Sequence, residues 1–314
     1  MIASAGVLAA ALLSAALMGL AIQRGATCMV AAVDEVLTHR RANRAAALAE
    51  AAVWVGGLAF LAATMGWLSM TPAAYPVTLG TVAGGVLLGL GAWVNRACVF
   101  GAVARIGSGE WAYLATPLSF FLGCLVPLSA PLPVATVSEF GVGSGARAIA
   151  LVFALLAIWR LFAAARAPHP GRFLWHPHRA TLLIAVTFVT TLLCAGPWAY
   201  TDALAALARS MEAMLPLRLA MAAALLGGAV AGGAIAGKLR RQRPHVSGLL
   251  RCGAGGALMG MGAMLVPGSN DGLILLGLPA MLPHAWVAVA VMTLSIAAAI
   301  GLAAVTSAAA AAKA

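Results

Sequence analysis

Three positions in this sequence place a thiol or a hydroxyl where a short helix is expected to begin. Cys28, Cys98 and Ser269 each precede a brief run of helix-forming residues. The first N–H groups of a helix are unpaired and carry partial positive charge, which favours an anion. A neutral thiol is a weak, polarizable donor that can contact a sulfur-containing anion without holding it too tightly for release. The pattern therefore predicts contact points for a passing anion.

These short helices are predicted at residues 28–37, 99–106 and 271–281. Each is too short to cross a bilayer, which needs roughly 20 apolar residues. Asn270 lies beside Ser269 and adds an amide. Arg24 and Arg96 precede the two cysteines, and each either attracts anions or extends to the lipid headgroups. The candidate substrate-binding residues are Cys28, Cys98, Ser269, Asn270, Arg24, Arg96, Gly91 and Gly262.

The rest of the chain has the composition of a membrane protein. Its 314 residues are 63% hydrophobic and 9% charged, with a mean hydropathy of +1.01. Backbone polar groups in lipid must be satisfied within the protein, so we expect an all-α integral membrane protein, a polytopic bundle of about eight or nine transmembrane helices. The first apolar stretch lacks a basic start and is predicted to be a retained helix. The predicted spans are 4–22, 45–69, 77–94, 113–130, 146–165, 180–200, 217–237, 249–266 and 284–311.

The net charge of +11 is predicted to set membrane topology rather than to bind nucleic acid. The basic residues form short clusters between apolar runs, as the positive-inside rule describes, and these loops are expected to be cytoplasmic. The clusters are Arg40, Arg41 and Arg44; Arg160, Arg166, Arg172 and Arg179; and Lys238, Arg240, Arg241 and Arg243.

An internal repeat links the two halves of the chain. Residues 84–101 align with residues 255–272, with identical glycines at several positions, and Cys98 is aligned with Ser269. A looser overlay places residues 17–30 on 225–238. Repeated short, Gly-interrupted segments are typical of transporters whose site lies at the repeat interface near the midplane. We expect one membrane domain, 1–314, with pseudo-symmetric halves at about 1–130 and 180–314 and a linking region at about 131–179.

Other chemistries have less support in the sequence. Cys124, Cys194 and Cys252 lie in or at the edge of apolar runs and are predicted to pack, and the histidines of the 168–178 loop are expected to be solvated. No metal or cofactor is predicted, and no Gly-rich nucleotide loop is present. Two alternatives to transport stay open. A membrane thiol redox protein would want paired cysteines, whereas Cys28 and Cys98 stand 70 residues apart with no other cysteine near either in the sequence. A structural subunit of a membrane complex would direct Arg24, Arg96 and Arg105 toward partners.

The motifs resemble a known family. The segments "QRGATC", "GGVLLGLGAWVNRACVFGAVARIGSG" and "GGALMGMGAMLVPGSNDG" are similar to the repeated motifs of the YeeE/YedE sulfur-transport family. The resemblance implies a multi-pass protein of the bacterial inner membrane, not an enzyme, that takes up thiosulfate past cysteines at the starts of short helices. Cys28 and Cys98 match the first two motif cysteines, and Ser269 departs from the third, which leaves the exact anion open. Some relatives work with a TusA-like sulfur-carrier protein.

Overall fold

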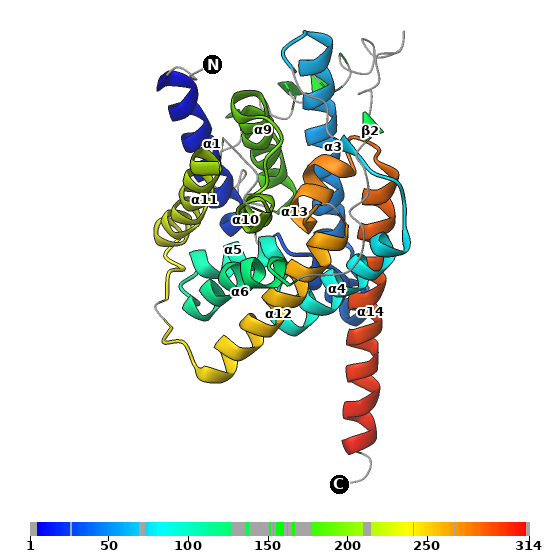
Figure 1. Ribbon diagram of the computed structural model, residues 1–314. Helices are drawn as coiled ribbons and strands as arrows, with labels where there is room; N and C mark the ends of the chain where they lie inside the picture. Colours follow the sequence, from blue (N-terminus) through cyan, green and yellow to red (C-terminus); the bar gives the residue numbers. More distant parts are fainter. Residues whose placement is uncertain are drawn as a thin grey trace.

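The protein is helical throughout the part that the computed structural model describes (Figure 1). The described residues are 5–25, 27–68, 73–126, 136–137, 177–209, 215–240, 242–266 and 268–311, with scattered positions between 151 and 166. Two short strands, β1 (Ala73–Ala74) and β2 (Thr136–Val137), pair antiparallel. The long helices are α1 (Ala5–Gly25), α3 (Asn43–Thr64), α4 (Leu79–Asn95), α9 (Pro177–Ala195), α11 (Leu215–Ile235), α12 (Val246–Leu265) and α14 (Pro283–Ala311).

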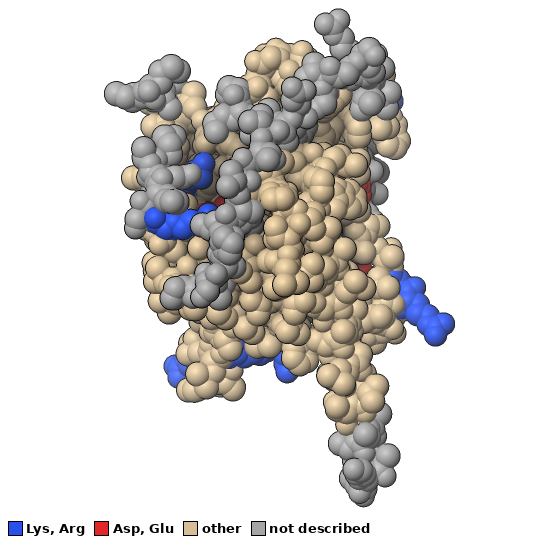
Figure 2. All heavy atoms as spheres, turned by 45° about the vertical axis from the view of Figure 1, so that its right-hand side comes forward, with Lys and Arg blue, Asp and Glu red and all other residues tan. Residues whose placement is uncertain are grey.

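This architecture is that of a multi-pass membrane protein, as the composition predicts. Within the described ranges, seven helical stretches are long and apolar enough to cross a bilayer. On the face seen in Figure 2 the surface is mostly uncharged, and basic side chains gather at its lower edge and its sides. An apolar band with basic residues beyond it is the arrangement that a bilayer requires.

One predicted span is shorter in the structure. The 3₁₀ turn η1 (Trp111–Leu114) and helix α6 (Ala115–Cys124) replace the expected helix over 113–130. Pro127 follows in the sequence, and the residue before a proline is disfavoured in the helical region, which ends α6 early. The predicted span over 146–165 and the linking region lie largely outside the described residues.

Close contacts between helix backbones hold the bundle together. Helices α1 and α11 lie side by side (Figure 1), and α4 packs on α12. A β-carbon placed on Gly228 would overlap the backbone carbonyl of Ala16, and one on Gly91 would lie 2.7 Å from the carbonyl oxygen of Gly255. Glycine at these points lets two helix axes approach, which is the main source of affinity between helices in lipid.

A matched pair of glycines in α11 tests this packing. Gly228→Ala is expected to destabilise the protein by about 1–3 kcal/mol because the new methyl group meets backbone atoms of α1 that cannot move independently. The neighbouring Gly227 has open space around it, so Gly227→Ala is expected to be neutral or to stabilise by up to about 1 kcal/mol through helix propensity. Thermal unfolding in detergent measures both. Equal unfolding midpoints for the two variants would contradict the assigned contact.

Four short helices begin in the interior of the bundle. These are α2 (Met29–His39), α5 (Val99–Gly107), α10 (Tyr200–Arg209) and α13 (Asn270–Gly272), which continues into a π-helical turn, η2 (Leu273–Gly277). Three were predicted, and their starts at Cys28, Cys98 and Ser269 are confirmed. The fourth, α10, was not. The looser overlay of residues 17–30 on 225–238 implies that a short helix follows residue 238. This implication is wrong, because the described residues between α11 and α12 form turns and loop, and the additional short helix follows α9.

Candidate functional site

The thiols of Cys28 and Cys98 meet where two short helices begin. Each cysteine is the N-cap of its helix with extended backbone, and neither side chain caps its own helix. The Met29 N–H donates a hydrogen bond to the Cys98 sulfur over 3.2 Å, and the Cys28 sulfur lies against Gly101 in the first turn of α5. The first turns of α2 and α5 thus contribute N–H groups and two sulfur atoms to one place.

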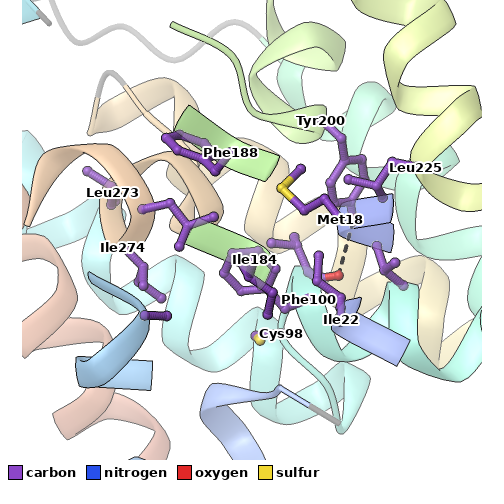
Figure 3. Close-up of a cluster of buried hydrophobic side chains, with 14 of the residues drawn as sticks. Met18, Ile22, Cys98, Phe100, Ile184, Phe188, Tyr200, Leu225, Leu273 and Ile274 are labelled. Carbon is purple, nitrogen blue, oxygen red and sulfur yellow. Dashed lines mark hydrogen bonds between the residues drawn. The ribbon is translucent and has the colours of Figure 1, made fainter. Parts of the chain in front are cut away.

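This thiol pair lies in a closed, apolar part of the molecule. Cys28 is 8% exposed and Cys98 is fully buried. A β-carbon on Gly101 would lie 2.6 Å from the Cys28 sulfur, so glycine is needed for the approach of α5 to α2. Figure 3 shows Cys98 beside Ile184 and Phe100 at the lower edge of a cluster of hydrophobic side chains. Fixed dipoles act more strongly on a charge here than they would in water.

Both thiols are free, and their proximity corrects one expectation. Their separation along the chain suggested that neither cysteine had a partner, yet the fold brings the two N-caps together. Spacing in the sequence is therefore no argument against a thiol pair. Among the described residues, no three His, Cys, Asp or Glu side chains come together as a metal site requires.

A second polar cluster forms where α10 and α13 begin. We call Ser269, Asp202, Asp271 and Thr201 the carboxyl bridge. The Ser269 hydroxyl lies 2.6 Å from Asp202 Oδ1 and 2.5 Å from Asp271 Oδ1, and the Ser269 N–H donates to Asp202 over 3.0 Å. Thr201 donates its hydroxyl hydrogen to Asp271. All members of the bridge are buried except Asp202, which is nearly so.

Counting hydrogens shows what this bridge requires. A serine hydroxyl has one hydrogen to donate, whereas the Ser269 oxygen contacts two carboxyl groups at hydrogen-bonding distance. The one hydroxyl hydrogen therefore serves one of the two carboxyl groups or is shared between them. The Ser269 hydroxyl is fully engaged within the protein. The sequence predicted it as a direct anion contact, and in this structure it holds two acids together.

Asn270 lies beside this bridge, and its side chain has no hydrogen-bond partner in the part of the chain that the structure describes. It is 1% exposed, and neither its amide nitrogen nor its amide oxygen has a hydrogen-bond partner among the described residues. A buried amide without partners costs about 1–3 kcal/mol, which a bound ligand can recover. Helix α13 contacts α5, and Tyr200 at the start of α10 donates to the Val99 carbonyl over 3.2 Å. The two clusters therefore share one central region.

The remaining predicted residues lie around this centre rather than in it. Gly91 and Gly262 face the backbone of the opposite helix at the α4–α12 crossing, so their missing side chains serve packing. Arg24, at the end of α1, is partly exposed. Arg96 is exposed, takes a left-handed conformation at the end of α4, and lines a cavity on that side.

Sequence reasoning missed the contribution of α10. Tyr200, Thr201 and Asp202 approach the centre from a helix that was interpreted as the end of a span and a connecting segment. A signal was present, because an aspartate within an apolar stretch is by default a functional candidate. Asp202 stands in the stretch Ala180–Arg209, which is apolar enough to cross a membrane.

Short helices whose N-termini meet inside a membrane bundle are a feature of transporters that bind anionic substrates. The sequence pattern of the Sulphur transport family matches residues 24–298, and the chain belongs to that family. It is similar to the thiosulfate transporter TsuA of Spirochaeta thermophila, with 27% identity over 306 residues that cover 87% of this chain and 92% of that protein.

Proposed function

We propose that this protein takes up a small sulfur-containing anion of the thiosulfate class across the bacterial plasma membrane, and that Cys28 and Cys98 contact it in succession. The observation that carries the proposal is the meeting of the two thiols at the uncapped starts of α2 and α5. Membership of the Sulphur transport family and the similarity to a thiosulfate transporter support the substrate class.

The thiol site suits passage better than storage. The helix ends supply partial positive charge that offsets the cost of bringing a dianion into a dry interior. The Cys98 sulfur accepts its hydrogen bond from a backbone N–H, and a full positive charge in contact with the anion at this depth would bind a dianion too strongly for release. Soft sulfur donors match a substrate with an exposed soft sulfur atom.

The second half of the site provides harder donors. Asn270 carries an amide without a protein partner, and amide groups bind oxygen atoms of an anion well. We propose that the anion meets the thiols with its sulfur end and Asn270 with its oxygen end. A TusA-like sulfur carrier is a candidate partner on the cytoplasmic side, as the family resemblance implies.

Uptake in cells that lack other sulfate and thiosulfate routes tests this function. We expect expression of the protein to restore growth on thiosulfate, and unlabelled thiosulfate to compete with labelled thiosulfate better than sulfite or sulfate does. A set of competitors with equal potency would contradict the substrate class. Absence of flux in every case would remove the transport function.

The proximity of the two thiols makes a dithiol redox protein the second candidate. Proteoliposomes with the purified protein separate the two functions. Transport requires both thiols reduced, so flux is expected to persist in dithiothreitol and to fall when an oxidant links the thiols. A requirement for a quinone or another electron acceptor would favour the redox function.

A further inference from the structure

A basic cavity lies beside the thiol site, at the loop between α11 and α12. It has a volume of about 300 Å³. The end of α4, the turn η1, the loop before α12 and the first turns of α12 enclose it. The residues that matter here are Arg96, Tyr113, Arg243, His245, Ser247 and Arg251.

Positive charge dominates the cavity wall. Three arginines line it, and the one carboxylate in the lining, Glu110, is paired with Arg105 over 2.9 Å. The guanidinium groups of Arg105 and Arg251 lie 5.1 Å and 5.6 Å from the centre of the Tyr113 ring, and Arg251 donates to the Tyr113 hydroxyl over 3.2 Å. Tyr113 thereby holds Arg251 in place, which prepares the cavity for an anion.

One buried donor beside this cavity has no acceptor among the described residues. The Nε atom of Arg251 is buried with no hydrogen-bond partner among the described residues. Helix α12, which is 20 residues long, begins here, and its N-cap His245 makes no side-chain capping bond. Ser247 and Gly248 in its first turn line the cavity. A long helix start, three guanidinium groups and an unsatisfied buried N–H are complementary to the oxygens of an anion.

We propose that this cavity binds a small divalent oxyanion and is the cytoplasmic station that the transported anion occupies after the thiols. The role in transport rests on the proposed function; anion binding by itself does not. Arg96 connects the cavity with the thiol site. It lines the cavity and stands two residues before Cys98, so the Cα atoms of Arg96 and Cys98 are at most about 7 Å apart. The α11–α12 loop carries Lys238, Arg240 and Arg243, which the positive-inside rule places in the cytoplasm.

Binding of thiosulfate to the purified full-length protein tests the station. The Cys98→Ala background removes one of the central contacts. Calorimetric titration in nanodiscs of zwitterionic lipid then reports the cavity through the difference in affinity between variants on this shared background. Arg243 and His245 are exposed, so the double variant Arg243→Gln/His245→Gln is expected to fold normally and to bind thiosulfate at least about tenfold more weakly. Lys238→Gln removes one charge from the same loop outside the cavity and is expected to bind as the background does.

The outcomes separate the two proposals. Weaker binding in the double variant with unchanged binding in Lys238→Gln supports anion binding in the cavity, even if proteoliposomes show no flux and the role in transport fails. Equal affinity in both variants overturns the station, even if flux is normal. Loss of thiosulfate binding in phosphatidylglycerol nanodiscs at the same ionic strength would show that a lipid headgroup fills the cavity, and it would overturn the assignment to the transported anion.

Discussion

Replacing Cys98 by alanine is expected to lower thiosulfate uptake at least about tenfold, because one hydrogen-bonding contact to a charged ligand is worth about 1.5–3 kcal/mol. The same change removes the sulfur that accepts the Met29 N–H, so the start of α2 loses its alignment with α5. Initial uptake rates in cells, normalised to the amount of protein in the membrane, measure the effect.

Cys124 provides the matched control for this experiment. It is also buried, and its thiol donates to the Gly260 carbonyl over 3.5 Å at the contact between α6 and α12. Cys124→Ala removes the same number of atoms away from the two thiols. We expect its uptake to stay within about twofold of the wild type, since a single weak thiol bond contributes little. Normal uptake by Cys98→Ala would exclude that thiol from the pathway.

Ser269→Ala is expected to destabilise the protein by about 3 kcal/mol or more. The serine bridges two buried carboxyl groups, and hydrogen bonds to charged groups contribute about 1.5–3 kcal/mol each. Without the hydroxyl, Asp202 keeps the backbone N–H of residue 269 and Asp271 keeps the Thr201 hydroxyl as donors, but the two acids lose the group that bridges them in a low dielectric. Thermal unfolding in nanodiscs measures the loss. Ser295→Ala is its control, because the Ser295 hydroxyl donates to the Val291 carbonyl of its own helix.

The same position has a distinct expectation for selectivity. From the repeat, Ser269→Cys should shift preference toward the softer anion if residue 269 touches the substrate. In the structure the Ser269 hydroxyl is engaged with Asp202 and Asp271, so we expect the ratio of thiosulfate to sulfite competition to stay unchanged while stability falls. A clear rise in thiosulfate preference in Ser269→Cys would mean that residue 269 turns toward the pathway during transport.

The sequence by itself indicates that this protein folds in a lipid bilayer, and it indicates where three of its short helices begin. Apolar runs of membrane-spanning length and basic residues gathered in loops are local features of the sequence. Local features can be recognised without knowledge of the fold. The starts of α2, α5 and α13 were visible for the same reason, because Cys28, Cys98 and Ser269 stand at breaks between a Gly-rich span and a short run. The glycines of the repeat likewise indicated tight helix crossings before any contact was known.

Only the tertiary structure decided which of these helix starts meet. Cys28 contacts the start of α5, and Ser269 is joined to Asp202 of α10, a helix that sequence patterns had merged with its neighbours. Such pairings depend on how helices cross. The crossings are set by small differences in the packing of helix backbones that are far apart in the sequence. Periodicity reports which side of a helix is apolar, but it carries no information about which N-terminus lies opposite another. The thiol pair and the carboxyl bridge are therefore properties of the packed bundle, since each draws its members from segments that are remote in sequence.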